Sequence, residues 1–199
     1  MTEILVLYYS RTGAVEALAR EVCRGIDAVN DVEARLRTVP PVSAITEATA
    51  DTIPSAGPPY VTHADLNECD GLVMGSPTRF GNMAAPLKYF LDSTGSEWLG
   101  GTLSGKPAGV FTSTSTLHGG QESTLLTMAL PLIHHGMLLV GIPYTEPELS
   151  TTTTGGSPYG ASHVSWNRDT DGLSAEEKKL AQALGKRVAQ IAVKLRAVR

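Results

Sequence analysis

Cysteine is almost absent from this chain, which has two cysteines, Cys23 and Cys69, among its 199 residues. Two cysteines without CxxC spacing cannot build a disulfide framework, so we expect both to stay reduced. No run of about 18 apolar residues occurs, so no membrane insertion is predicted. Met1 to Tyr9 leads directly into a strand-like pattern without a basic segment or cleavage site, which predicts a cytoplasmic protein.

Positive charge is not in excess either. Lysine and arginine number 16 against 20 acidic residues, for a net charge of -4, so we expect no basic face for nucleic acid. The same charge is mild beside the strongly acidic surface expected of a small electron shuttle steered by charge. A hydrophobic content of 42% over this length suits one core and predicts a single domain spanning residues 1–199.

Several catalytic signatures are missing. No GxGxxG follows the first predicted strand and no GxSxG occurs anywhere, so dinucleotide fingerprints and hydrolase elbows are not predicted. No carboxylate pair or His/Cys cluster has the spacing of metal ligands, so we expect no metal site. Gly100 to Lys106 fits the opening of a P-loop, but Pro107 occupies the hydroxyl position and the segment precedes a strand. We treat that match as chance.

Strand-like and helix-like segments alternate along the chain. Ile4 to Tyr9 is apolar on both faces, as expected of a central parallel strand covered by helices. Alternation of this kind predicts an α/β protein with a parallel sheet and right-handed crossovers. The further predicted strands are Val32–Val39, Asp70–Gly75, Pro107–Thr112 and Met137–Ile142. The predicted helices start at Ala14, Pro86, Gln121 and Ser174.

The first and last helices have the clearest signals. An apolar stripe at helical spacing follows Ala14 and consists of Val15, Leu18, Ala19, Val22 and Ile26. Ser174 and Glu177 form a capping-box pattern before the last helix. Residues 39–62 are rich in proline, threonine, alanine and serine, and we expect them to form an excursion over the surface.

The segment after the first strand could bind phosphate. Ser10 to Gly13 supplies two hydroxyls and a glycine just before a helix. A phosphate there would meet free backbone N–H groups and the positive end of the helix dipole. The alternative is that Ser10 or Thr12 merely caps the helix, and this motif alone does not decide between them.

Two more polar loops follow neighbouring strands, Pro77 to Asn82 and Thr112 to Gln121. Ligands bind beyond the carboxyl ends of the strands in open α/β sheets, so all three loops should meet at one edge. Each loop alone could be a solvated turn, but together they favour a mononucleotide with a flat polar ring. His134 and His135 end a helix, where the dipole favours a cation and a structural role is the default.

With these residues assembled, the sequence resembles the WrbA family of NAD(P)H:quinone oxidoreductases over nearly its whole length. The PTRFGN loop and its distance from the Ser10 turn make the resemblance specific. The matching stretches are Leu5–Ser10, Gly75–Met83, Phe90–Gly95 with Trp98, Gly119–Glu122, His134–Met137 and Gly155–Ala161. The resemblance implies a flavodoxin-like three-layer sandwich with a five-stranded parallel sheet in the order 2-1-3-4-5.

The resemblance also implies flavin mononucleotide (FMN) as cofactor. It assigns His134 and Arg79 as catalytic residues beside the flavin, and Trp98 as a wall for a flat quinone. The implied FMN-binding residues are Ser10, Arg11, Thr12, Gly13, Ala14, Val15, Pro77, Thr78, Arg79, Phe80, Gly81, Ser113, Thr114, Ser115, Thr116, Leu117, His118, Gly119 and His134.

The implied reaction is two-electron reduction of a quinone by NADH or NADPH, in an active site completed by neighbouring subunits of a homotetramer. Two positions depart from the family pattern. Thr12 stands where relatives often have an aromatic residue associated with nicotinamide binding, and Ala14 where they often have histidine. The rival hypothesis is a flavodoxin-type electron carrier, which exchanges single electrons and has no substrate pocket.

Overall fold

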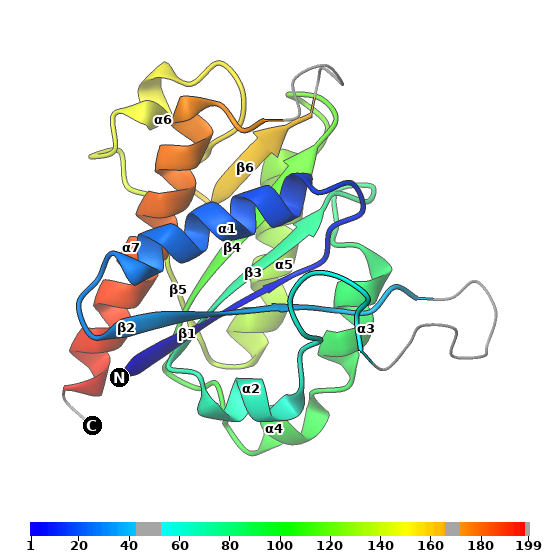
Figure 1. Ribbon diagram of the computed structural model, residues 1–199, viewed down its shortest axis with the longest axis vertical. Coiled ribbons are helices and arrows are strands. Elements are labelled where there is room, and N and C mark those ends of the chain that lie inside the picture. Colours follow the sequence, from blue (N-terminus) through cyan, green and yellow to red (C-terminus); the bar gives the residue numbers. More distant parts are fainter. Residues whose placement is uncertain (43–52, 166–171, 198–199) are drawn as a thin grey trace.

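The computed structural model of the chain describes residues 1–42, 53–165 and 172–197. Within them, six parallel strands form one sheet with helices on both faces (Figure 1). The strands are β1 (Thr2–Tyr8), β2 (Val32–Thr38), β3 (Gly71–Pro77), β4 (Pro107–Thr114), β5 (Leu138–Leu139) and β6 (Ala161–Val164). The helices are α1 (Ala14–Asp27), α2 (His63–Glu68), α3 (Ala85–Asp92), α4 (Gly95–Leu99), α5 (Gln121–His134), α6 (Glu148–Thr151) and α7 (Ala175–Arg196).

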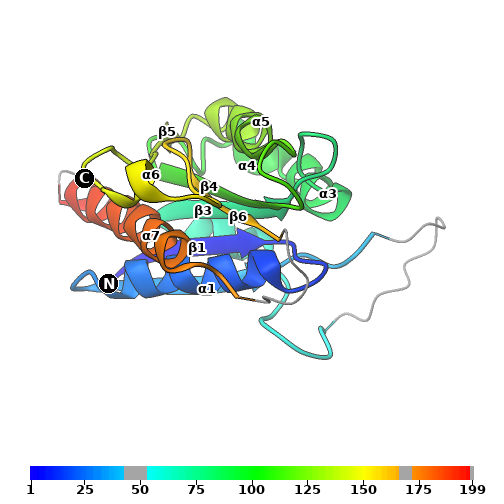
Figure 2. The ribbon, with the colours of Figure 1, turned by 90° about the horizontal axis from the view of Figure 1, so that it is seen from above.

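The sheet runs in the order β2-β1-β3-β4-β5, and β6 also pairs with β4. This confirms the predicted flavodoxin-like architecture and strand order. Helices α1 and α7 cover one face, and α3, α4 and α5 cover the other (Figure 2). None of the helices in the described ranges is both long and apolar enough to cross a membrane.

Strand β1 shows why the sheet is buried on both sides. Ile4 and Val6 pack into the apolar cluster beneath α1 and α7, whereas Leu5 and Leu7 pack into the cluster on the opposite face. Alternate side chains of a strand point to opposite faces, so a continuous apolar run requires a cover on each. The prediction of a central strand from this run is confirmed.

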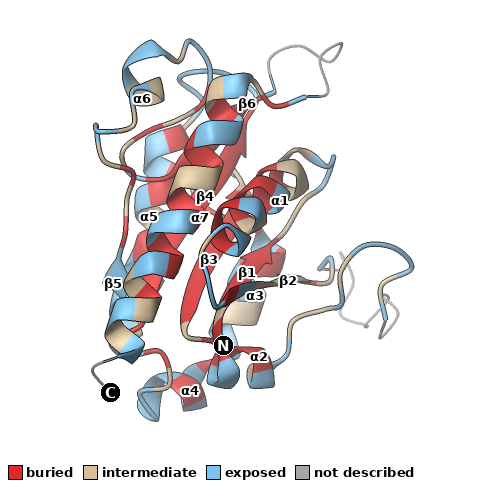
Figure 3. Ribbon diagram, turned by 60° about the vertical axis from the view of Figure 1, so that its left-hand side comes forward, coloured by how far each residue is buried: buried red, intermediate tan, exposed pale blue. Residues whose placement is uncertain are grey.

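The two helices with clear sequence signals form as predicted. All five stripe residues of α1 are buried, and the inward faces of α1 and α7 are buried while their outward faces are exposed (Figure 3). The capping box of α7 is complete, because Glu177 N donates to Ser174 Oγ at 3.1 Å and Ser174 N donates to Glu177 Oε2 at 2.8 Å.

The predicted strand Met137–Ile142 is wrong in extent, and a sixth strand was missed. Only Leu138 and Leu139 form β5, and Ile142 N donates to the Pro158 carbonyl instead of to β4. The chain leaves the sheet there and returns at residue 161, where β6 pairs with the second half of β4. One sheet position is therefore filled by two segments. The four residues of β6 are too few to give a clear sequence pattern.

Other differences concern short or shifted elements. Helices α2, α4 and α6 have at most 6 residues each and were not predicted. Strand β4 runs two residues beyond the predicted Thr112, because β3 and β6 hydrogen-bond to it on both sides. In the predicted surface excursion, residues 43–52 lie outside the described residues, and Tyr60 forms a parallel bridge with Thr38.

Glu177 joins β6 to α7. Its carboxylate accepts hydrogen bonds from the backbone N–H groups of Gly155, Val164 and Ser174 and lies 2.9 Å from His163 Nδ1. Burial disfavours the charged form of Glu177, but the hydrogen bonds from His163 and from the backbone outweigh it and hold the pKa below its usual value. The ionised carboxylate is thus part of the folded structure.

Candidate active site

The three predicted loops follow β1, β3 and β4 and come together at one edge of the sheet (Figure 1). Thr78 N donates to the Ser113 carbonyl at 3.0 Å, which joins the second loop to the end of β4. This edge carries the carboxyl ends of adjacent parallel strands, where open α/β sheets bind ligands.

The first loop leaves the N-terminus of α1 uncapped. Gly13 is the N-cap residue, with φ 93°, and no side chain in the described part of the chain caps the helix. Ser10 Oγ accepts a hydrogen bond from Gly13 N at 3.1 Å, so it stabilises the turn and does not bind the first-turn amides. The first hydrogen bond of the helix runs from Ala17 N to the Gly13 carbonyl. The N–H groups of Ala14, Val15 and Glu16 therefore have no partners within the helix.

This geometry fits a phosphate group. Free N–H groups, the positive end of the helix dipole and the exposed position of the loop form an anion site. A Cβ added at Gly13 would meet no heavy atom within 4 Å, so the site is open to solvent. The glycine is required by its left-handed conformation. The sequence left open whether this segment binds phosphate or whether Ser10 or Thr12 caps the helix. Capping by either side chain does not occur.

The second loop forms a tight turn that exposes Phe80. Arg79 and Asn82 exchange two backbone hydrogen bonds, and Phe80 and Gly81 between them have φ 53° and 77°. Positive φ at both central positions is typical of a type I′ turn. The Phe80 side chain is 108% exposed. A bulky residue in this strained conformation, without burial, is a functional candidate.

Hydroxyl groups of α5 hold this turn in place. Thr124 Oγ1 donates to Thr78 Oγ1 at 2.8 Å, and Thr127 Oγ1 donates to the Gly81 carbonyl at 3.1 Å. Sequence reasoning missed both threonines. The available signal was a polar residue, Thr124, at a buried position of an amphipathic helix.

The third loop is shorter than predicted. Ser113 and Thr114 are buried in β4, whereas the remaining predicted ligand residues, Ser115, Thr116, Leu117, His118 and Gly119, are exposed. Gln121 Nε2 donates to the Leu117 carbonyl at 3.1 Å, and the side-chain Oε1 of Gln121 accepts a hydrogen bond from Ser162 Oγ on β6. Buried Gln121 therefore fixes the loop to β6, a role that its position at a helix start did not reveal.

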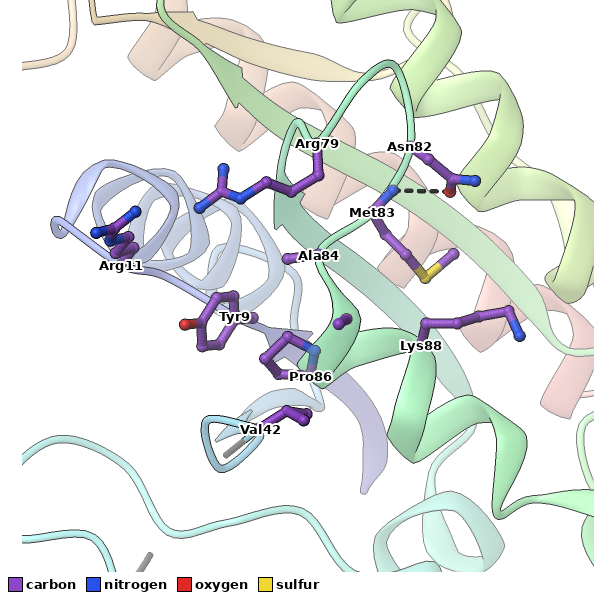
Figure 4. A pocket seen from close by; sticks show the side chains of 10 residues that line it. Tyr9, Arg11, Val42, Arg79, Asn82, Met83, Ala84, Pro86 and Lys88 are labelled. Atoms are coloured by element: carbon purple, nitrogen blue, oxygen red, sulfur yellow. Dashed lines mark hydrogen bonds between the residues drawn. The ribbon is translucent and has the colours of Figure 1, made fainter. Parts of the chain in front are cut away.

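A cavity of about 650 Å³ opens between the first two loops and the start of α3 (Figure 4). This volume is within the range of small-molecule sites. Its walls combine an apolar floor with basic and amide side chains. It is lined by Tyr9, Arg11, Val42, Arg79, Asn82, Met83, Ala84, Ala85, Pro86 and Lys88.

Trp98 and His134 meet each other but not this cavity. Trp98 Nε1 donates to the His134 carbonyl at 2.8 Å, and both line a second cavity of about 480 Å³. His134 ends α5, whose 14 residues place it about 20 Å along the helix from the loop that precedes Gln121. Within one chain, His134 therefore lies at the opposite end of α5 from the loops at this edge of the sheet, and its predicted role beside a flavin stays a prediction.

His135 lies in the same second cavity as Trp98. Its Nε2 is 3.1 Å from Thr94 Oγ1, and its Nδ1 is buried without a hydrogen-bond partner among residues 1–42, 53–165 and 172–197. Burial lowers the pKa of His135, which favours the neutral ring.

Comparison with known proteins agrees with this geometry. The family model described as NADPH-dependent FMN reductase matches residues 10–145, which include the three loops. Among solved structures, the flavodoxin, WrbA-like protein from Agrobacterium tumefaciens is 22% identical, with a TM-score of 0.69 over 98% of this chain and 99% of that one. A flavodoxin from the domain Archaea is 17% identical, with a TM-score of 0.62 over 96% of this chain and 99% of that one.

Oxidised Flavodoxin 1 from Bacillus cereus is similar in fold as well, at 14% identity and a TM-score of 0.61 over 95% of this chain and 98% of that one. At these identities the solved structures establish the fold. The family match and the flavodoxin-like fold support FMN as cofactor and NAD(P)H as electron donor. The chain belongs to the family of NADPH-dependent FMN reductases.

Proposed function

We propose that the protein is a WrbA-type, FMN-dependent NAD(P)H:quinone oxidoreductase that reduces quinones by two electrons. The observation that carries this proposal is the cavity beside Arg79. A carrier of single electrons needs only an exposed flavin edge, whereas a cavity of about 650 Å³ next to the ring-binding loops gives room for a substrate.

In this proposal the free N–H groups of the α1 N-terminus and the Ser10 turn hold the FMN phosphate. Thr78, Arg79 and Phe80 lie along the isoalloxazine ring, and the exposed 115–119 loop surrounds its pyrimidine end. The hydrogen bonds from Thr124 and Thr127 keep the second loop in position before the cofactor binds, so less conformational entropy is lost on binding.

Bound FMN would supply the hydride chemistry, accepting a hydride from NAD(P)H and passing it to the quinone. Arg79 would stabilise negative charge near the pyrimidine carbonyls, because a positioned cation is most effective where charge develops. Within the described residues, the Arg79 guanidinium donates one hydrogen bond, to the Thr78 carbonyl at 2.7 Å, and its other N–H groups could bind the cofactor.

Trp98 and His134 would act on a neighbouring subunit's flavin. They lie together at the far end of α5 from the loops of their own chain, so they can border a flavin only across a subunit interface. This arrangement requires self-association, which in our proposal is a homotetramer with Trp98 as a wall for the quinone. Ultracentrifugation of the FMN-loaded protein tests it, and a monomer at working concentration would contradict it.

The competing function is a flavodoxin-type electron carrier. Purified protein loaded with FMN should oxidise NADH or NADPH with saturable, steady-state reduction of benzoquinone. A carrier would give no saturable turnover, which would overturn the proposal. FMN should also bind far more tightly than riboflavin, which lacks the phosphate and its charge-assisted hydrogen bonds, each contributing about 1.5–3 kcal/mol. Equal affinity for the two flavins would contradict the assignment of the α1 N-terminus.

A further inference from the structure

Two arginines from different loops line the large cavity. Figure 4 shows the Arg79 side chain extending toward the loop that carries Arg11, with Tyr9 below them. Among the described residues, neither arginine forms an ion pair, whereas Arg20 and Arg35 pair with carboxylates. Exposed guanidinium groups at a cavity wall are available to an anionic ligand.

The described wall of this cavity has no carboxylate. Its charged members are Arg11, Arg79 and Lys88, in a protein whose net charge is -4. In Rossmann-fold dinucleotide sites, which this chain does not contain, an acidic residue binds the ribose 2′-hydroxyl of NADH, whereas an arginine nearby accommodates the 2′-phosphate of NADPH, and the same charge complementarity applies at other nucleotide sites. The cavity therefore has the charge that suits a phosphorylated ribose.

Arg11 is also not needed for the flavin phosphate. The first-turn N–H groups of α1 and the Ser10 turn already form an anion site with backbone donors. The Arg11 side chain lines the cavity from this loop, whereas the anion site is formed by backbone N–H groups (Figure 4). Arg79 is committed to the ring in the proposed function and adds positive potential from the other wall.

We propose that Arg11 binds the 2′-phosphate of NADPH and makes NADPH the preferred electron donor. This inference rests on the proposed oxidoreductase function and names the residue that selects its donor. A phosphate monoester carries a charge of about -1.5 to -2 at pH 7, and a guanidinium can bind it with two parallel hydrogen bonds. The pyrophosphate, which NADH and NADPH share, is the other possible anion, and the choice of probes separates the two.

The binding test uses FMN-loaded protein and calorimetric titration. Adenosine 2′,5′-bisphosphate should bind at least about tenfold more tightly than 5′-AMP, which lacks only the 2′-phosphate. Arg11→Gln should abolish this difference and leave the affinities for 5′-AMP and 5′-ADP unchanged. Arg20→Gln removes an exposed, ion-paired cation on α1 and should change none of these affinities.

The kinetic test compares kcat/KM for the two donors. The wild-type protein should prefer NADPH, and Arg11→Gln should lower kcat/KM for NADPH about tenfold more than that for NADH, so that the ratio of the two falls. Equal binding of the bisphosphate and 5′-AMP would overturn the inference, as would an equal loss of both donors in the variant. A fall in FMN affinity without a change in donor selectivity would assign Arg11 to the flavin phosphate instead.

The two proposals fail in different ways. If FMN-loaded protein shows no saturable turnover with either donor, the proposed function is wrong, whatever Arg11 binds. If it turns over NADH and NADPH equally well and Arg11→Gln changes neither, the proposed function stands and the inference about Arg11 is wrong.

Discussion

Phe80 combines a left-handed backbone with a side chain that no part of the described chain covers, so replacing it should stabilise the flavin-free protein. Its φ of 53° costs a bulky L-residue about 1–2 kcal/mol. The side chain is 108% exposed, so its removal loses no burial. Asparagine tolerates the left-handed region, and Phe80→Asn should therefore raise the free energy of unfolding by about 1 kcal/mol.

Phe80→Ala is the matched comparison, because alanine removes the ring but keeps the backbone strain. Urea unfolding of flavin-free protein, repeated at two protein concentrations to detect self-association, should rank Phe80→Asn above both Phe80→Ala and the wild type. If Phe80 contacts the flavin ring as proposed, both variants should also bind FMN more weakly. Equal stability of the asparagine and alanine variants would show that the turn is not held in this strained conformation.

Four further predictions concern the ligand loops and α7. Thr12→Tyr should lower KM for the reductant by up to about tenfold, because a ring packed on the nicotinamide contributes roughly 0.5–1.5 kcal/mol, while stopped-flow oxidation by quinone stays unchanged. An unchanged NADH dependence would exclude position 12 from the nicotinamide site. Arg79→Ala should lower the flavin reduction potential, measured by anaerobic titration, by the equivalent of about 1–3 kcal/mol, because a cation near the reduced ring is lost. An unaltered potential with normal FMN binding would show that Arg79 does not stabilise the reduced flavin and has a structural role. Thr124→Val should weaken FMN binding by roughly fivefold, because it removes a hydrogen bond of about 1 kcal/mol that positions the second loop. Thr102→Val, away from the site, should leave FMN affinity unchanged, and equal affinities of the two variants would contradict the positioning role of Thr124. The pKa of Glu177 is lowered in the folded protein, so its ionised form stabilises the fold at neutral pH, and this stabilisation is lost as the pH falls below the usual value of 4.5 and through the folded pKa. Glu177→Gln should thus reduce the free energy of unfolding at pH 7 by roughly 3 kcal/mol and make that free energy fall less steeply as the pH is lowered. Urea unfolding of both proteins between neutral and acidic pH tests this, and an equally steep fall in the variant would contradict it.

The sheet order and the ligand edge could be predicted because their signals are local. The apolar run of β1 requires helices on both faces, and the polar loops follow directly after strands. Strand β6 gave no such signal, since four residues between loops show no period. The break after β5 depends on a hydrogen bond from Ile142 N to the Pro158 carbonyl. These residues are far apart in the chain, so no local pattern predicts the break.

Candidate site residues were predictable where they follow a strand, and less so where they act from a helix. Thr124 and Thr127 hold the second loop through contacts about 46 residues away in the chain, which no local pattern encodes. For His134 the limit was of another kind. The predicted helix from Gln121 to His135 already implied a separation of about 20 Å from the preceding loop, so helix length alone could have shown that His134 does not reach the three loops of its own chain.

The division of one sheet position between β5 and β6 has a consequence for changes in chain length. The ligand edge is fixed by β6 through Gln121 and Glu177, and α6 between the two strands has no buried residue. The turn at residues 143–147, which precedes α6, can therefore accept insertions without shifting the loops at the edge of the sheet, whereas Leu149 of α6 packs against the core. This turn offers a position for a fused tag or reporter domain.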